Sequence, residues 1–314
     1  MTMGWRIMGG AEDVPSSDFP NEELLMSHIG QEQFKRIAIT HFRAIARRGG
    51  VFPHTILYGP PGLGKTSLAR VLAKCLSGRF RMFVGGDLSS DRIHEIIQDL
   101  QERDLIFIDE IHAINRSGAE ILYEVAQDFS YLGTRVAPFT MVGATTDVGD
   151  VPKPLFDRFK WQYRMQAYSI SELTEIVLSH FPKLSDDAAQ ECAKRALDTP
   201  RIAVNMAVHV DAAQGEYTPE QVFAMHGIDA MGLNPEHRSV LVRLKENKAP
   251  MGFEALQFGT GISKTDLLNL YEKPLVKLGF VVRTPKGRVI TERGLEYLAL
   301  GEVGNEGKNA RGRP

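Results

Sequence analysis

Short runs of hydrophobic residues recur through the first half of the chain, and a longer segment with helical spacing follows most of them. The run Leu105–Asp109 is apolar until it ends in a carboxylate, and Glu110 follows directly. Such an unbroken run is typical of a strand that is buried on both faces of a parallel sheet. The pattern predicts strands at 54–58, 81–84, 105–109, 139–144 and 161–165.

The segments between these strands carry hydrophobic residues three and four positions apart. In 90–101, for example, Ile93, Ile96 and Ile97 fall on one helical face. Strands that alternate with helices predict an α/β domain, in which helices cover both faces of a parallel sheet. We expect helices in this part at 22–49, 67–76, 90–101 and 118–127.

From residue 168 onward the pattern becomes purely helical, and no strand is evident. A helix is expected to start at Thr218, with an N-cap threonine, Pro219 in the first turn and Gln221 three residues after the cap. We therefore expect a small helical lid domain over 168–233. Its other helices are predicted at 171–179, 186–197 and 201–213.

The last part combines three helices, a hairpin and a final helix that is expected to end at Leu300. This order predicts a winged-helix DNA-binding domain over 234–300. Residues 301–314 are Gly-rich and charged, so we expect a disordered tail, whereas 1–20 should be an irregular start of the α/β domain, 1–167. The winged-helix elements are predicted at 235–247, 254–258, 263–278, 280–283 and 288–291, with the hairpin tip at 284–287.

The charges of the 314-residue chain are unevenly distributed. The whole chain has a net charge of −2, but residues 234–300 carry +4 and residues 1–233 carry −7. A basic module on an acidic body favours a nucleic-acid partner for that module. The only cysteines, Cys75 and Cys192, lack nearby metal ligands, so we expect both to be core residues in a reducing compartment. Because no apolar run reaches membrane-spanning length and the first residues lack a signal-peptide core, we expect a cytoplasmic protein without a membrane partner.

Residues 59–66, with the sequence GPPGLGKT, match the phosphate-loop pattern G-x-x-x-x-G-K-[ST] at every fixed position. A predicted strand precedes the loop and a predicted helix follows it, which is the context that this motif requires. Lys65 is expected to reach the β- and γ-phosphates of ATP, and the Thr66 hydroxyl to ligate Mg²⁺. The residues expected to bind nucleotide here are Gly59, Pro60, Gly62, Leu63, Gly64, Lys65, Thr66 and Ser67.

Two further strand ends carry polar residues that suit phosphate chemistry. Asp109 is expected to hold Mg²⁺, and Glu110 to orient and deprotonate the attacking water; the alternative is a pair of surface carboxylates. Thr145 and Thr146 end the next strand, where a hydroxyl can sense the γ-phosphate or hold the water, although β-branched pairs are also common in strands. We expect no catalytic role for His112.

Two arginines are candidates for contacting the γ-phosphate. Arg158 follows a turn after the threonines and is suited to act on the site of a neighbouring subunit. Arg201 starts a helix of the lid and is suited to act on its own site. Taken singly, each is equally consistent with a solvated surface arginine.

The order of these motifs resembles that of the AAA+ ATPases, and in particular the RuvB family of Holliday-junction branch-migration motors. The matching stretches span nearly the whole chain, and the most specific is GFVVRTPKGRVIT at 279–291. The other matching stretches lie at 29–31, 57–66, 107–112, 143–146, 199–203, 227–233 and 271–275.

The resemblance implies an ATP-hydrolysing ring, a homohexamer, that moves double-stranded or four-way-junction DNA in recombination and repair. It implies an arginine finger at Arg158, sensor 1 at Thr146 or Thr145, and sensor 2 at Arg201. It further implies adenine contacts near Ile29 and Tyr168, and DNA contacts by Arg283, Lys286 and Arg288 of the wing.

Some positions depart from the family pattern. Phe156 stands where the family usually has a further arginine, and Asp147 and Lys160 replace an arginine and a glycine. Residues 127–138 are shorter than the family's hairpin that docks on RuvA, which leaves the use of a RuvA-like junction-binding partner open. Two other functions stay under consideration. One is an AAA+ loader or switch that acts on a DNA-bound client protein, and the other is a DNA-binding adaptor that does not hydrolyse ATP.

Overall fold

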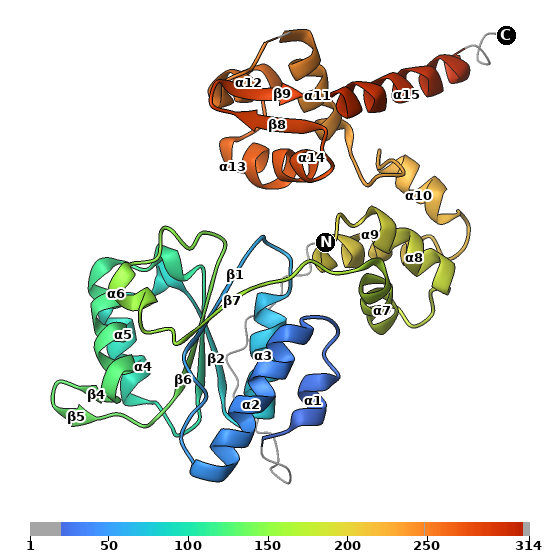
Figure 1. Ribbon diagram of the computed structural model, residues 1–314. Coiled ribbons are helices and arrows are strands. Elements are labelled where there is room, and N and C mark those ends of the chain that lie inside the picture. The colour runs from blue at the N-terminus through green and yellow to red at the C-terminus, as the bar shows by residue number, and fades with distance from the viewer. Residues whose placement is uncertain (1–19, 248, 310–314) are drawn as a thin grey trace. The chain divides into compact units, whose positions relative to one another are not determined.

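The computed structural model describes residues 20–247 and 249–309, and the side chains up to residue 300 (Figure 1). The described chain divides into two compact units. One contains the chain up to Glu172 together with Thr199–Arg201, and the other contains Leu173–Asp198 and the chain from Ile202 onward. Within the described residues, no helix has the length and apolar character needed to cross a membrane.

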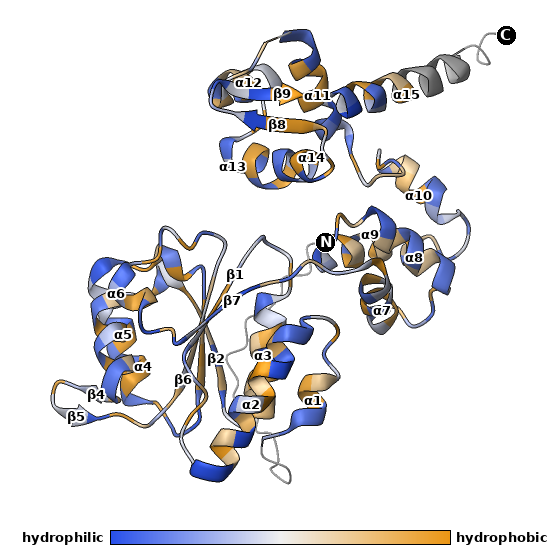
Figure 2. Cartoon of the chain, in the orientation of Figure 1, coloured by the Kyte–Doolittle hydropathy of each residue, from blue (hydrophilic) through white to orange (hydrophobic). Residues whose placement is uncertain are grey.

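The first unit is built on a parallel sheet of five strands in the order β2-β3-β6-β1-β7. β3 and β6 lie in its interior and are buried along almost their whole length, which confirms the expectation of doubly covered strands. Figure 2 shows orange, hydrophobic positions along α3 and α4, the helices on either side of this sheet. The strands are β1 (Thr55–Tyr58), β2 (Phe80–Val84), β3 (Leu105–Asp109), β6 (Thr140–Thr145) and β7 (Trp161–Arg164), all within a residue or so of the predicted bounds.

Helices cover both faces of this sheet, with α1, α2 and α3 on one side and α4, α5 and α6 on the other (Figure 1). α4 shows why: Ser89 accepts a hydrogen bond from the Arg92 N–H as its N-cap, and Ile93, Ile96 and Ile97 are buried against the sheet. The elements are α1 (Glu22–Met26), α2 (Glu32–Arg48), α3 (Lys65–Cys75), η1 (Gly85–Asp87), α4 (Ser90–Gln98), η2 (Ile111–Ala113), α5 (Arg116–Asp128) and α6 (Lys153–Phe156).

The expectation of one helix over 22–49 is wrong, because α1 and α2 are separate helices. The break falls at Gln31, which has a left-handed backbone with φ of 56° and cannot continue a right-handed helix. Its buried side chain accepts hydrogen bonds from the Tyr163 hydroxyl at 3.1 Å and the Gln166 N–H at 3.0 Å. These distant partners stabilise a turn that helical periodicity does not reveal.

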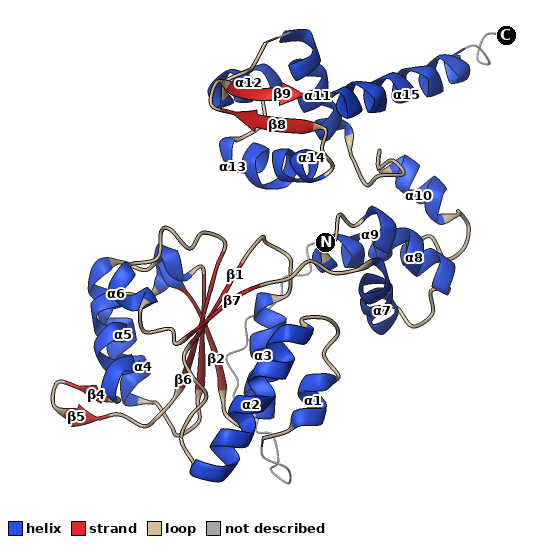
Figure 3. Cartoon of the chain, in the orientation of Figure 1, coloured by secondary structure: helices blue, strands red, loops and turns tan. Residues whose placement is uncertain are grey.

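A second feature absent from the predictions is a small antiparallel hairpin between α5 and β6 (Figure 3). Its strands are β4 (Ser130–Tyr131) and β5 (Thr134–Arg135), and Leu132 at the tip is 75% exposed. Two-residue strands carry too little alternation to be recognised from sequence. The hairpin occupies the segment that is shortened relative to the family pattern.

Four helices follow along the chain in the region expected to form the lid. The Thr218 side chain accepts from the Gln221 N–H, and the Gln221 side chain accepts from the Thr218 N–H, which confirms the predicted helix start as a capping box. The lid and the winged-helix elements belong largely to one contact unit, so the boundary at 233 stays a prediction. The helices are α7 (Ile170–His180), α8 (Asp186–Arg195), α9 (Pro200–Ala212) and α10 (Pro219–Met225).

The last part has the predicted winged-helix order of three helical segments, a hairpin and a final helix. Its core includes Leu241, Leu256, Leu275 and Phe280, all nearly inaccessible to solvent. The elements are α11 (Pro235–Asn247), α12 (Phe253–Thr260), α13 (Lys264–Asp266), η3 (Leu267–Glu272), α14 (Lys273–Lys277), β8 (Val281–Thr284), β9 (Gly287–Ile290) and α15 (Glu292–Asn309).

The segment predicted as one helix over 263–278 contains a π-helical stretch, η3, between α13 and α14. Pro274 has no N–H, so it cannot donate to the Leu270 carbonyl four residues earlier. His237 Nε2 lies 3.2 Å from that carbonyl oxygen and satisfies it instead. The local change of helix type thus accompanies a proline and a buried side-chain partner.

The final helix extends further than predicted. α15 continues to Asn309, into the stretch that was expected to be disordered, and residues 310–314 lie outside the described residues. The expectation for residues 1–20 also lies outside them, except at Pro20. Cys75 and Cys192 are both buried and unpaired, as expected for core cysteines.

Candidate active site

Three neighbouring strands end at one edge of the sheet, and each is followed or closed by a residue of the predicted site. Gly59 follows β1, Asp109 ends β3 and Thr145 ends β6. β6 lies between β3 and β1, and the Gly59 N–H donates to the Thr145 carbonyl at 3.2 Å. The carboxyl edge of a parallel α/β sheet is the usual place for a ligand, so the fold brings these residues together where nucleotide would bind.

The phosphate loop leads directly into α3, whose first residue is Lys65. Its N-cap, Gly64, has no side chain to cap the helix, so the first N–H groups of α3 have no side-chain cap. Lys65 is 7% exposed, and its Nζ donates to the carbonyls of Gly59 at 2.9 Å and Pro60 at 3.1 Å. A buried ammonium and a helix N-terminus in one loop form a site for phosphate oxygens.

The residues at this edge also fit a magnesium ion. Thr66, the second residue of α3, offers a hydroxyl, and Asp109 offers a carboxylate at the end of β3. The Asp109 Oδ1 atom accepts from the Glu110 N–H at 3.1 Å, which restrains that side chain. Hydroxyl and carboxylate oxygens, completed by substrate phosphates, are the ligands that Mg²⁺ prefers.

The two threonines at the end of β6 have different surroundings. Thr145 is fully buried, and its hydroxyl donates to the Asp147 carbonyl at 2.8 Å. Thr146 is exposed, and its hydroxyl donates to Glu110 Oε2 at 3.4 Å. Of the two candidates for sensor 1, Thr146 is therefore the one beside Glu110, whereas the Thr145 hydroxyl is hydrogen-bonded to the backbone carbonyl of Asp147.

His112, for which no role was expected, lies within this group. Its Nδ1 atom is 2.9 Å from Thr145 Oγ1 and 3.2 Å from Glu110 Oε2. The signal available from sequence was its position two residues after Glu110, in the stretch FIDEIH. Only the short turn η2 folds the side chain back onto both partners.

Arg201 lies against the phosphate loop, although it is far from it in sequence. Its N–H donates to the Gly62 carbonyl at 3.3 Å. Gly62 has φ of 83°, and a Cβ there would come within 3.0 Å of Arg201 Cβ and 2.8 Å of Thr199 Cγ2. Glycine is thus favoured at this position for two reasons, and the Arg201 backbone lies beside the phosphate loop of its own chain.

The residues implied for adenine contact also lie near the loop. The Tyr168 hydroxyl donates to the Leu63 carbonyl at 3.3 Å, and the tyrosine ring lies against Gly30, next to the half-buried Ile29. Burial raises the pKa of Tyr168, which keeps the hydroxyl protonated and able to donate.

Arg158 is placed away from the phosphate loop of its own chain. It precedes β7, and parallel strands begin at the edge opposite to the one where Asp109 and Thr145 lie. Its Nη2 donates to Gln127 Oε1 at 2.9 Å, and its guanidinium lies 4.1 Å from the centre of the Tyr123 ring. Both partners belong to α5, so this arginine does not join the other predicted site residues.

The three wing residues predicted to contact DNA have unequal surroundings. Glu272 is fully buried, and its Oε1 accepts from Arg283 Nε at 2.8 Å and from Arg288 Nε at 2.9 Å. The Arg288 side chain is 18% exposed and also lies over the Phe253 ring, whereas the Arg283 side chain is 49% exposed. Lys286 is exposed in the two-residue hairpin loop between β8 and β9. The exposed charges on this wing are therefore those of Lys286 and Arg283.

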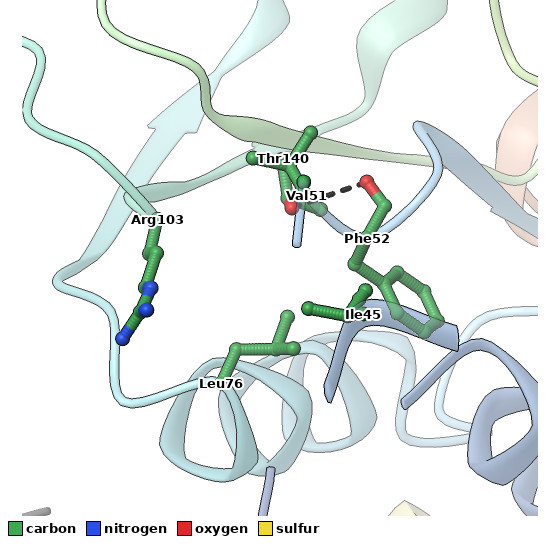
Figure 4. Close-up of a pocket in the computed structure, with 7 residues that line it drawn as sticks. Ile45, Val51, Phe52, Leu76, Arg103 and Thr140 are labelled. Atoms are coloured by element: carbon green, nitrogen blue, oxygen red, sulfur yellow. Dashed lines mark hydrogen bonds between the residues drawn. The ribbon is translucent and has the colours of Figure 1, made fainter. Parts of the chain in front are cut away.

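A small hollow in the first unit lies apart from these residues (Figure 4). Thr140, the first residue of β6, lines it and donates to the Phe52 carbonyl at 3.2 Å. The hollow, which Ile45 and Leu76 also line, lies where β6 begins. The phosphate loop, Asp109 and Thr145 lie at the opposite edge of the sheet, where the strands end.

Two family models match the chain. Residues 21–165 match the Holliday junction DNA helicase RuvB P-loop domain, and residues 230–299 match the RuvB C-terminal winged helix domain. Together they cover the phosphate-loop unit and the winged-helix elements described above.

Similar proteins share most of this length. The Holliday junction branch migration complex subunit RuvB of Synechococcus sp. (strain RCC307) is 36% identical over 301 residues, which cover 87% of this chain and 88% of that protein. Its counterpart from Fusobacterium nucleatum is 34% identical, covering 88% and 91%.

Solved structures give the same result. The Thermotoga maritima RuvB Holliday junction branch migration motor matches with a TM-score of 0.77 and 34% identity, covering 86% of this chain and 95% of that one. A mutant of the same Thermotoga protein matches with a TM-score of 0.79 and 33% identity, covering 88% and 97%. With both family models and relatives matching over most of its length, the chain belongs to the RuvB family.

Proposed function

We propose that this protein is an ATP-hydrolysing ring motor that moves double-stranded DNA and drives branch migration of four-way junctions. The observation that carries the proposal is a set of residues suited to phosphate chemistry at one sheet edge, in a chain that also has a winged helix. Lys65, Glu110 and Thr146 supply that set, and a basic hairpin supplies the DNA contact. Relatives that bear the name of the branch migration subunit are similar to this chain over most of its length.

The residues divide the work of hydrolysis between them. Lys65 and the first N–H groups of α3 bind the β- and γ-phosphates of ATP. Glu110 accepts the proton of the attacking water, and the Thr146 hydroxyl orients the Glu110 carboxylate. Thr66 and Asp109 would hold Mg²⁺, which neutralises charge on the phosphate oxygens when it is bound. Arg201 contacts the same phosphates from its position against Gly62.

The proposal includes a homohexameric ring. Arg158 lies at the edge where the strands of its own sheet begin, and its side chain contacts α5. It therefore acts on the nucleotide bound by a neighbouring subunit. The small β4–β5 hairpin is the segment that would contact a RuvA-like junction-binding protein. Because this hairpin is short, the proposal that the protein moves DNA does not depend on that contact. A cytoplasmic location is part of the same proposal.

Steady-state ATP hydrolysis, measured without DNA, with duplex and with a synthetic four-way junction, tests the function. A motor hydrolyses ATP continuously and faster when DNA is present. A loader would need its client protein for turnover, and an adaptor would hydrolyse no ATP under any of the three conditions. Turnover that does not respond to either form of DNA would contradict the motor.

A further inference from the structure

The position of His112 raises a question that the proposed roles of its neighbours leave open. The histidine contacts Thr145 and Glu110 through a single atom, Nδ1, at 2.9 Å and 3.2 Å. A ring nitrogen can donate or accept here, depending on which nitrogen carries the proton. The effect on Glu110 therefore depends on the tautomer.

The Thr145 hydroxyl determines that tautomer. A hydroxyl has one proton to donate, and Thr145 donates it to the Asp147 carbonyl at 2.8 Å. The same oxygen accepts from the Asp147 N–H at 3.0 Å. Toward His112, Thr145 can therefore only accept, which places a proton on Nδ1. The Glu110 carboxylate, 3.2 Å from the same nitrogen, can likewise only accept, so the single Nδ1 proton faces both oxygens in this tautomer.

The Glu110 side chain needs such restraint. Its backbone is fixed in the left-handed region with φ of 48°, and Gly85 packs so closely that a Cβ there would lie 2.4 Å from the Glu110 carbonyl oxygen. The side chain itself is 41% exposed, and rotation about its single bonds can move the carboxylate. Among the described residues, Glu110 Oε2 accepts a hydrogen bond from the Thr146 hydroxyl at 3.4 Å, and the same oxygen lies 3.2 Å from His112 Nδ1.

We propose that His112 is a positioning residue for ATP hydrolysis, which holds the Glu110 carboxylate beside Thr146 by donating from Nδ1. Thr145 couples this arrangement to the phosphate loop, because its carbonyl accepts from the Gly59 N–H at 3.2 Å while its hydroxyl fixes the histidine tautomer. The inference rests on the proposed function, in which Glu110 is the base.

Two substitutions of His112 test the inference. His112→Ala removes the donor, so kcat for ATP should fall about 10- to 100-fold, the range typical of a misplaced catalytic group. KM and the affinity for a fluorescent ATP analogue should stay within about twofold, because the phosphate loop is unchanged. His112→Asn keeps an N–H donor near the position of Nδ1 and should retain most of the parent kcat. The melting temperature of each variant verifies that the fold is intact.

A double-substitution cycle separates positioning from a merely structural role. In a Glu110→Gln background, the His112→Ala change should cause no further loss of the residual hydrolysis, measured with radiolabelled ATP, because the group that it positions is already disabled. An additional loss as large as that in the parent background would show that His112 acts independently of Glu110 and would overturn the inference.

The outcomes also distinguish this inference from the proposed function. A parent that hydrolyses ATP, an inactive Glu110→Gln variant and a fully active His112→Ala variant would overturn only the role of His112. Equal losses in His112→Ala and His112→Asn would overturn the donor role. A parent without ATP turnover would overturn the proposed function, and this inference with it.

Discussion

Lys65 and Glu110 lie within one sheet edge but have different contacts, and their substitution should separate binding from chemistry. Lys65→Ala removes the buried ammonium of the phosphate loop, so nucleotide binding or turnover should be abolished. Glu110→Gln keeps the shape of the side chain but loses the base, so binding should persist while hydrolysis falls by about 10²–10⁴. Binding of a fluorescent nucleotide and steady-state turnover measure the two effects. Turnover by Glu110→Gln within twofold of the parent would disprove the assignment.

His54 predicts how the stability of the first unit depends on pH. Its Nδ1 accepts from the Met141 N–H at 3.0 Å, its Nε2 lies 3.2 Å from the Ala126 carbonyl, and burial lowers its pKa to about 4. The unfolded chain binds a proton at this histidine near pH 6.5, so unfolding becomes easier as pH falls from 6.5 toward 4. One such group contributes at most about 1.4 kcal/mol per pH unit.

Melting temperatures between pH 7.5 and pH 5 measure this effect. The parent should lose more stability over that range than His54→Gln, which cannot take up the proton. The same dependence on pH in both proteins would show that His54 is not the group responsible.

Residues of the site differed in how far the sequence predicted them. Lys65, Asp109 and Glu110 stand at fixed spacings in contiguous motifs, so their strand–loop–helix context was enough to place them at one edge. The place of His112 in this group was missed because it depends on a contact with Thr145, which is 33 positions away. The docking of Arg158 on Tyr123 and Gln127 likewise depends on how α5 packs, which no local pattern encodes.

At the scale of elements, the wing combines an internal ion-pair cluster with an exposed tip. Because Glu272 is fully buried, Arg288→Ala would leave it with fewer partners and should destabilise the protein by about 1–3 kcal/mol. Lys286→Ala should instead leave the melting temperature unchanged, weaken binding to all duplex sequences alike and reduce the log–log salt slope by roughly one unit.

Duplex binding across a series of salt concentrations, together with thermal melting, tests this division. Basal ATP hydrolysis serves as the control, since the phosphate loop belongs to the other unit. If Lys286→Ala binds DNA with the parent's affinity and salt slope, DNA is held elsewhere. If Arg288→Ala reduces the salt slope of duplex binding without lowering the melting temperature, Arg288 contacts DNA and does not stabilise buried Glu272.

The elements themselves show which signals were sufficient. β3 and β6 were predicted because doubly buried strands leave continuous apolar runs, and the start of α10 because its capping box is local. The break between α1 and α2 was missed because Gln31 owes its conformation to partners more than 130 positions away. The π-helical stretch η3 was missed for a similar reason, since the partner of the Leu270 carbonyl is His237.

For the whole molecule, the position of Arg158 predicts that activity belongs to an oligomer. A chain with Lys65→Ala lacks a working phosphate loop but keeps Arg158, whereas Arg158→Ala has the opposite defect. Because loss of an arginine finger typically costs 10³–10⁵ in rate, each variant alone should be nearly inactive. Mixed rings contain some interfaces with both parts intact, so mixing the two variants should restore part of the ATP hydrolysis. If mixtures at all ratios stay as inactive as the separate variants, Arg158 does not act on a neighbour.

Movement of a junction tests the account most directly. A synthetic four-way junction with homologous, fluorescently labelled arms is incubated with the protein, ATP and Mg²⁺, with and without RuvA. The motor proposed here should convert the junction into two duplexes in an ATP-dependent manner, and Glu110→Gln should not. Hydrolysis that responds to DNA while the junction stays intact, both with and without RuvA, would contradict branch migration as the function of this protein.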